Sequence, residues 1–142
     1  MTERDSNANA DLPAAAGGGR GYHHGDLRNG LLEAARTILE EESLAALTLR
    51  AVARKAGVSH AAPYRHFPNH EALLVELSTE GFDELRVRLM EAAKAPGSET
   101  DKIATIGAAY MRFVAQRPAL ARLMFGGQLP NRDQFPALGL KA

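Results

Sequence analysis

The side chains best suited to binding chemistry lie in one short stretch, between Ser43 and Asn69. This stretch contains no acidic residue, whereas the whole chain has a formal net charge of zero. A local positive charge of this kind attracts phosphate and supplies the sequence-independent part of affinity for DNA. A basic stretch is also typical of an ordinary solvated surface, so the charge alone leaves both interpretations open. The fixed cations are Arg50, Arg54, Lys55 and Arg65, and the nearby histidines are His60, His66 and His70.

Small and polar residues in the same stretch favour the DNA interpretation. An element that enters a DNA groove needs such residues in its first turn, so that its backbone can approach the base edges. Tyr64 can donate a hydrogen bond to a phosphate, and Arg65 can pair with phosphate or with guanine. Core packing is the alternative for the aromatic residues; we expect DNA contact for Tyr64 and core packing for Phe67. The residues expected in the first turn are Ser59, His60, Ala61 and Ala62.

Two short helices must position these side chains. Thr48 is a suitable N-cap for one helix, and Gly57 is a suitable residue to end it. Ser59 is the next N-cap candidate, and we expect it to open a third helix from His60 to Phe67. A connection of three residues between two short helices is typical of a DNA-binding helix-turn-helix.

The rest of the chain also predicts helices. Apolar residues recur at helical spacing from Leu27 to Leu39, after a candidate N-cap at Asp26. The acidic run 40–42 opposes the helix macrodipole, which predicts either fraying or a basic neighbour. Further helices are predicted from position 69 to about 94, around 103–114, and from Pro118. Because no segment has the alternating pattern of a strand, we predict an all-α fold.

Composition limits the organisation and the class of protein. We expect residues 1–22 to be a flexible tail, residues 23–70 to be the helix-turn-helix domain and residues 71–142 to be a helical effector-binding domain. No apolar run is long enough to cross a membrane, and no signal peptide is recognisable, so we expect a cytoplasmic protein. The chain has no cysteine. We found no arrangement of nucleophile, base and acid, so we expect neither an enzyme nor a bound cofactor or metal.

Three runs within this framework resemble the N-terminal domain of tetracycline-repressor (TetR) family regulators. They are LTLRAVARKAGVS from Leu47 to Ser59, YRHFPN from Tyr64 to Asn69, and EALL from Glu71 to Leu74. The resemblance covers about residues 26–80. It implies an operator-binding transcriptional regulator, most often a ligand-responsive repressor.

The resemblance also implies roles for individual residues. Thr48 matches a helix cap that touches phosphate, and Arg50 matches a position that reaches the bases or the backbone. Tyr64 and His66 match a phosphate-contacting pair. The chain departs from the family at His70, where a lysine is usual, and at Pro63, where another apolar residue is usual. The first departure predicts weaker or more pH-sensitive binding, and the second predicts a tilt of the helix.

The second half of the chain is similar to the effector domain of a subgroup called WHG-domain regulators. The similarity rests on YMRF from Tyr110, RPAL from Arg117 and LMF from Leu123. It implies a pocket for a small apolar effector, with plain core packing as the alternative. It also implies a homodimer, although the chain ends at Ala142, before the helices through which family members usually pair. A helical interaction module that pairs with a full-length regulator is therefore the second hypothesis. The residues expected to line the pocket are Phe82, Met90, Tyr110, Phe113, Met124 and Phe125.

Overall fold

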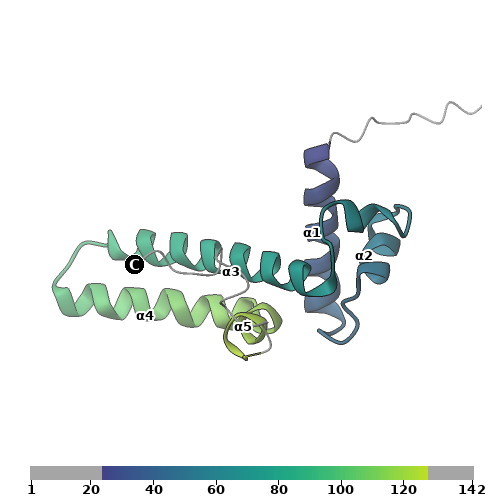
Figure 1. Ribbon diagram of the computed structural model, residues 1–142. Coiled ribbons are helices and arrows are strands. Elements are labelled where there is room, and N and C mark those ends of the chain that lie inside the picture. Colours follow the sequence, from purple (N-terminus) through teal and green to yellow (C-terminus); the bar gives the residue numbers. More distant parts are fainter. Residues whose placement is uncertain (1–23, 128–142) are drawn as a thin grey trace, which may run out of the picture.

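The computed structural model describes residues 24–127, so the expected tail at residues 1–22 lies outside the described part. The prediction of an all-α fold is confirmed. The helix α1 stands across one end of a long antiparallel pair formed by α3 and α4, and α5 lies in the corner between them (Figure 1). None of the helices in this part of the chain is long and apolar enough to span a bilayer. The elements are α1 (His24–Glu41), α2 (Leu49–Ala56), the 3-10 helix η1 (Ala62–Arg65), α3 (His70–Ala93), α4 (Glu99–Gln116) and α5 (Pro118–Phe125).

The helix α2 begins and ends where the sequence predicts. The Thr48 hydroxyl accepts a hydrogen bond from the backbone N–H of Ala51 at 3.1 Å, which satisfies a donor that has no partner within the helix. Gly57 ends the helix with a φ of 70°, a left-handed conformation that glycine adopts without steric cost. Both ends of the first short helix therefore follow from local chemistry.

The prediction of a capped α-helix from His60 to Phe67 is wrong. Only Ala62–Arg65 is helical, as a single 3-10 turn, and no side chain caps it. Pro63 has no backbone N–H, so it cannot donate the α-helical bond to the carbonyl of Ser59. That carbonyl instead accepts from the N–H of Ala62 at 3.0 Å, three residues away, which is the spacing of a 3-10 turn.

The ends of α1 differ in how well they were predicted. The helix begins at His24, two residues before the expected cap at Asp26. Its acidic end has the basic neighbour that the sequence predicts, because Lys55 Nζ lies 3.4 Å from Glu41 Oε2. This ion pair joins the C-terminal end of α1 to α2.

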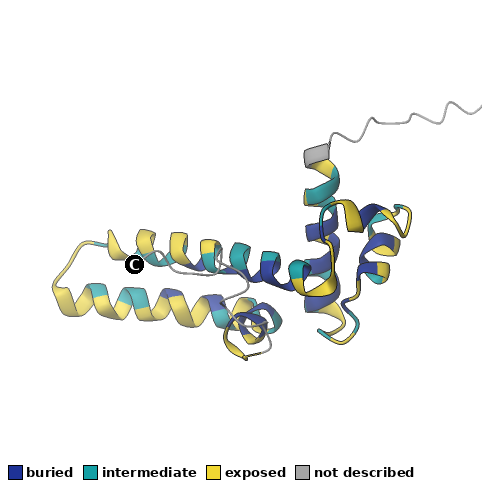
Figure 2. Cartoon of the chain, in the orientation of Figure 1, coloured by how far each residue is buried: buried dark blue, intermediate teal, exposed yellow. Residues whose placement is uncertain are grey.

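One hydrophobic core extends through the described helices. Buried residues from both sides of the expected boundary at position 70 belong to the same cluster, including Leu31, Leu73 and Phe113. Figure 2 shows buried residues along α1, along α2 and on α3 near its contact with α1. Gly81 lets α5 pack closely against α3, because a Cβ at this position would lie 2.6 Å from Met124 Sδ. The expected domain boundary at position 70 stays a prediction, because the hydrophobic core continues across that position.

Candidate nucleic-acid interface

Most of the residues expected to contact DNA are exposed on α2, on η1 and in the turns around them. Tyr64 is 59% exposed, whereas Phe67, three residues later, is 2% exposed and belongs to the core. This difference matches the expected division between a contact residue and a packing residue. Ala62 is buried and His66 is half-buried, so the backbone around them is held against the core. The exposed members of the predicted set are Thr48, Arg50, Ser59, His60, Ala61, Tyr64, Arg65 and His70.

The arginines of this surface are free of ion pairs. Arg50, Arg54 and Arg65 form none of the ion pairs found among residues 24–127, while Lys55 pairs with Glu41. Most other arginines in the described part of the chain lie against a carboxylate. The positive charge of the three arginines is thus not cancelled locally and is available to a polyanion.

Arg28 holds the C-terminal end of η1 in place. Its guanidinium lies over the ring of Phe67, 5.7 Å from the centroid, and its Nη2 lies 2.5 Å from Glu76 Oε1. Arg28 belongs to α1 and Glu76 to α3, so one side chain links two helices and the aromatic anchor between them. This arrangement gives the exposed Tyr64 a rigid support.

The start of α3 lies next to the same surface. Asn69 caps the helix, because its Oδ1 accepts from the backbone N–H of Ala72 at 2.8 Å. His70 is the first helical residue and is exposed. The Nε2 of His66 is buried and has no hydrogen-bond partner among the described residues. Contact between His66 and a phosphate would therefore use its other ring nitrogen or need a rearrangement.

Residues 31–77 match the family model described as bacterial regulatory proteins, tetR family. This segment contains α2, η1 and the packed parts of α1 and α3. This segment is therefore similar to the tetR family.

Two longer proteins extend the similarity beyond the tetR-family segment. The nucleoid occlusion factor SlmA of Marinomonas sp. (strain MWYL1) is 30% identical over 109 residues, which are 77% of this chain and 55% of SlmA. A solved structure of a protein with unknown function from Rhodococcus sp. RHA1 is 37% identical, with a TM-score of 0.71, over 84% of this chain and 63% of that chain. The chain therefore spans somewhat more than half of the length of these relatives.

The structure places the expected effector residues in three environments. Phe113 and Met124 are buried in the core. Phe82 and Phe125 meet edge to face with ring centroids 5.5 Å apart, and Tyr110 lies 6.2 Å from Phe125. Met90 is exposed further along α3 and contacts Arg86. Three of the six residues therefore form an aromatic cluster where α3, α4 and α5 meet.

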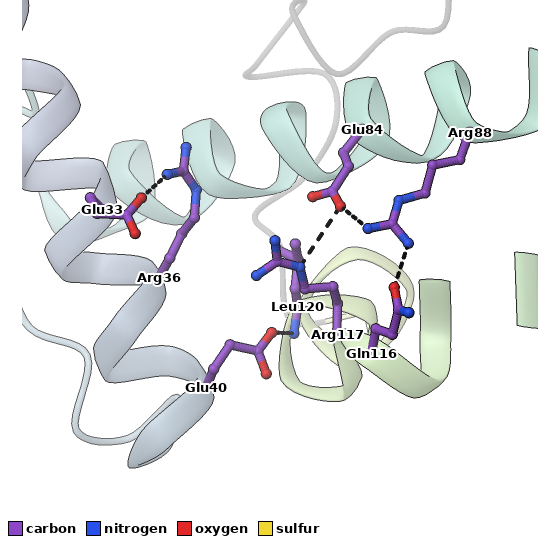
Figure 3. A network of polar contacts seen from close by, with 8 residues as sticks. All are labelled: Glu33, Arg36, Glu40, Glu84, Arg88, Gln116, Arg117 and Leu120. Atoms are coloured by element: carbon purple, nitrogen blue, oxygen red, sulfur yellow. Dashed lines mark hydrogen bonds and ion pairs between the residues drawn. The ribbon is translucent and has the colours of Figure 1, made fainter. Parts of the chain in front are cut away.

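A cleft of about 520 Å³ between α1, α3 and α5 was not predicted. Charged residues line most of it, and none of the six expected effector residues does. Figure 3 shows part of the polar network beside it, in which Arg36 contacts Glu33, and Glu84 contacts both Arg88 and Arg117. Burial lowers the pKa of Arg36, but hydrogen bonds and charge from Glu80 and Glu33 outweigh this effect and raise the pKa above its usual value. The pairs of Arg36 with Glu33 and of Arg88 with Glu84 lie within one helix at spacings of three and four. The contacts of Arg36 with Glu80 and of Arg117 with Glu84 join distant segments, so no local spacing in the sequence could have shown them.

Proposed function

We propose that the chain is a DNA-binding transcriptional regulator that acts as a repressor. One observation carries the proposal: the helix-turn-helix of the segment that matches the tetR family exposes a tyrosine and three arginines that form no ion pair among residues 24–127. Unpaired cations bind the DNA backbone, and an exposed reading turn contacts base edges. A buried core lies directly behind these residues, which supports them in a fixed geometry.

The proposed DNA contacts divide into those that position the protein on the DNA backbone and those that read the base edges. Thr48, Arg50 and Tyr64 are suited to phosphate, because the first two lie at the start of α2 and the third projects from η1. Ser59, His60 and Ala61 are exposed in the turn before η1 and are suited to the base edges. The family resemblance assigns His66 to the contacts with phosphate. Arg65 is suited to either class of contact. Ala62 contributes through its backbone, since its side chain is buried.

The start of α3 supplies one further anchor. The free N–H groups at a helix N-terminus carry partial positive charge and bind phosphate. His70 stands at this position and is exposed, so its ring can reach a phosphate held by these N–H groups.

Fluorescence anisotropy with duplex DNA from upstream of the chain's own gene tests the proposal. We expect specific binding. The logarithm of the association constant should fall linearly with the logarithm of the salt concentration, because phosphate contacts release counterions. The double variant Arg50→Ala, Arg65→Ala should bind more weakly with a shallower salt slope. Arg86→Ala is the matched control, since Arg86 is an exposed arginine on the distant part of α3. Absence of binding at about 50 mM salt would overturn the proposal.

We further propose that a small apolar compound regulates binding and that the protein acts as a homodimer. The aromatic cluster of Phe82, Tyr110 and Phe125 favours the first proposal, because aromatic rings at a helix junction suit apolar ligands. Such a compound should release DNA in the anisotropy assay, and Phe125→Ala should reduce the release. The alternative, a module that pairs with a full-length regulator, predicts DNA binding only in the presence of that partner.

A further inference from the structure

The turn that carries Tyr64 has little support of its own. It is the single 3-10 turn η1 of four residues, and no side chain caps it. The hydrogen bonds of a 3-10 turn have poorer geometry than those of an α-helix, so they hold the turn weakly. By contrast, α2 is fixed at one end by Thr48 and at the other by Gly57. The direction in which Tyr64 points therefore depends on what holds the residues before and after it.

The residues on the two sides of Tyr64 are held by the core. Before it, Ala62 and Pro63 are buried, so the start of the turn packs inward. After it, Phe67 is the next buried residue. The backbone N–H of Phe67 donates to the carbonyl of Pro63 at 2.8 Å, and this bond closes around Tyr64. The C-terminal side of the turn is thus fixed through Phe67.

Arg28 fixes the ring of Phe67 in turn. Its guanidinium lies 5.7 Å from the centroid of the ring, and its Nη2 lies 2.5 Å from Glu76 Oε1. A planar guanidinium can stack on an aromatic ring and bond to a carboxylate at the same time, whereas the ammonium of a lysine is a point charge. The carboxylate of Glu76 therefore keeps the guanidinium over the ring, and the ring keeps the turn in place.

The ion pair of Arg28 is better suited to orientation than to stability. The side chain of Arg28 is 37% exposed and that of Glu76 is 32% exposed. Ion pairs that water reaches contribute little to stability, because water competes for both charges. A binding side chain, however, keeps its geometry only when packing and hydrogen bonds behind it lock its position. Arg28 and Phe67 supply that support behind Tyr64.

We propose that Arg28 is a positioning residue for DNA binding, which holds Tyr64 toward a phosphate through Phe67 without touching DNA itself. The inference deepens the proposed function and rests on it, because Tyr64 is a DNA contact only within that proposal. Support of the turn is measured without DNA, and its effect on affinity is measured with DNA. A failure of the role of Arg28 is therefore distinct from a failure of the proposed function.

Amide hydrogen exchange of the full chain tests the support of the turn without DNA. In Arg28→Lys the N–H groups of His66 and Phe67, which both donate to the carbonyl of Pro63, should exchange several-fold faster. The N–H of Val52, which is hydrogen-bonded at the start of α2, is the internal control and should be unchanged. Equal acceleration at all three amides would show only a less stable chain. That result, or unchanged exchange at His66 and Phe67, overturns the proposal.

Arg36→Lys is the matched control. Arg36 also lies on α1 and also pairs with a glutamate of α3, since its Nη2 lies 2.5 Å from Glu80 Oε2, and its side chain is 32% exposed. Among residues 24–127, only Arg28 and Arg88 have a guanidinium over an aromatic ring. The control therefore changes an ion pair between the same two helices without changing the support of the turn. It should accelerate exchange at neither amide selectively, and it should leave DNA affinity unchanged.

Fluorescence anisotropy with the same duplex DNA as above tests the link between Arg28 and Tyr64. Arg28→Lys should bind about fivefold to tenfold more weakly than the unmodified chain. In a chain that already carries Tyr64→Ala, the same substitution should change the affinity less than about twofold, because the contact that Arg28 positions is absent. If the unmodified chain binds and the two substitutions weaken binding additively, only the role of Arg28 is overturned. If the unmodified chain does not bind, the proposed function is overturned as well.

Arg28→Ala separates positioning from direct contact with DNA. Removal of a cation that touches phosphate reduces the salt slope of binding by about one. If Arg28 acts only through Phe67, the alanine variant should bind at least as weakly as Arg28→Lys but keep the slope of the unmodified chain. Circular dichroism should show the same helical content in both variants. A slope reduced by about one assigns Arg28 to the DNA backbone and overturns the positioning role.

Discussion

The carboxylate of Glu40 accepts a hydrogen bond from the backbone N–H of Leu120 at 3.2 Å, although 80 residues separate them (Figure 3). Leu120 lies in the first turn of α5, where N–H groups have no partner within the helix. The N-cap residue of α5, Arg117, makes no side-chain capping bond. Glu40, at the end of α1, therefore performs for α5 the capping that the local sequence does not supply.

Replacement of Glu40 should weaken the docking of α5. Glu40→Ala removes the acceptor and the negative charge near a helix N-terminus, so the free energy of unfolding should fall by about 0.5–2 kcal/mol. Glu40→Gln keeps a carbonyl acceptor, so its free energy of unfolding should fall by less. Urea denaturation followed by circular dichroism measures both. Glu42→Ala is the control, since Glu42 is exposed, and a loss as large as that of Glu40→Ala would assign the effect to net charge alone.

Gly81 and Gly30 should respond to alanine in opposite directions. At Gly81 the new methyl group would lie 2.6 Å from Met124 Sδ and 3.2 Å from Leu120, so overpacking should outweigh the better helix propensity and destabilise the chain by roughly 1 kcal/mol. At Gly30 no neighbour among residues 24–127 lies within 4 Å of the new methyl group, so alanine should stabilise α1 by up to about 1 kcal/mol. Thermal unfolding of both variants checks the prediction, and stabilisation by Gly81→Ala would show that α5 packs more loosely.

Substitutions of Tyr64 and Phe67 should have different effects, the first on DNA binding and the second on the stability of the fold. Tyr64→Ala should weaken specific DNA binding by about 1–3 kcal/mol with an unchanged helical spectrum, because the side chain is exposed. Phe67→Ala should lower the free energy of unfolding by about 3–5 kcal/mol, because it removes a buried ring that Arg28 covers. Anisotropy and circular dichroism on both variants make the comparison. Loss of helix in Tyr64→Ala would assign Tyr64 to the core.

The start of α4 should show a pH dependence. The side chain of Ser98 hydrogen bonds to Asp101, and so does its backbone N–H, and these bonds lower the pKa of Asp101 below its usual 3.8. A lowered pKa in the folded state stabilises the fold above about pH 4, and this contribution is lost as the pH falls through the folded-state pKa. An NMR titration of the Asp101 carboxyl carbon measures the pKa directly. Ser98→Ala should move it upward, and an unchanged pKa in this variant would rule out the capping box as the cause.

Local chemistry accounts for the parts of the fold that the sequence predicted well. The bounds of α2 follow from Thr48 and Gly57, each of which acts on its own few neighbours. The start of α3 follows in the same way from the side chain of Asn69. The 3-10 turn was missed because Pro63 was expected only to tilt the helix. The missing N–H of Pro63 also redirects the carbonyl of Ser59 to the N–H of Ala62.

Contacts between distant segments account for what was missed. Glu40 meets Leu120, and Arg36 meets Glu80, only after the helices have packed. The exposure of the residues proposed to read DNA was predictable, because exposure of a polar turn is a local property. The angle at which α5 packs decides which of the six expected effector residues lie in the core and which form the aromatic cluster. The periodicity of the sequence does not predict that angle.

The unbroken length of α3 has a mechanical consequence. The helix has 24 residues and extends roughly 36 Å, at about 1.5 Å per residue, from the end that is proposed to face DNA to the turn that leads into α4. It acts as a lever arm, so a tilt of about 5° at the far end would displace the near end by about 3 Å, which is the length of a hydrogen bond. A tilt of this size would therefore be enough to break the phosphate contact that is proposed for Tyr64.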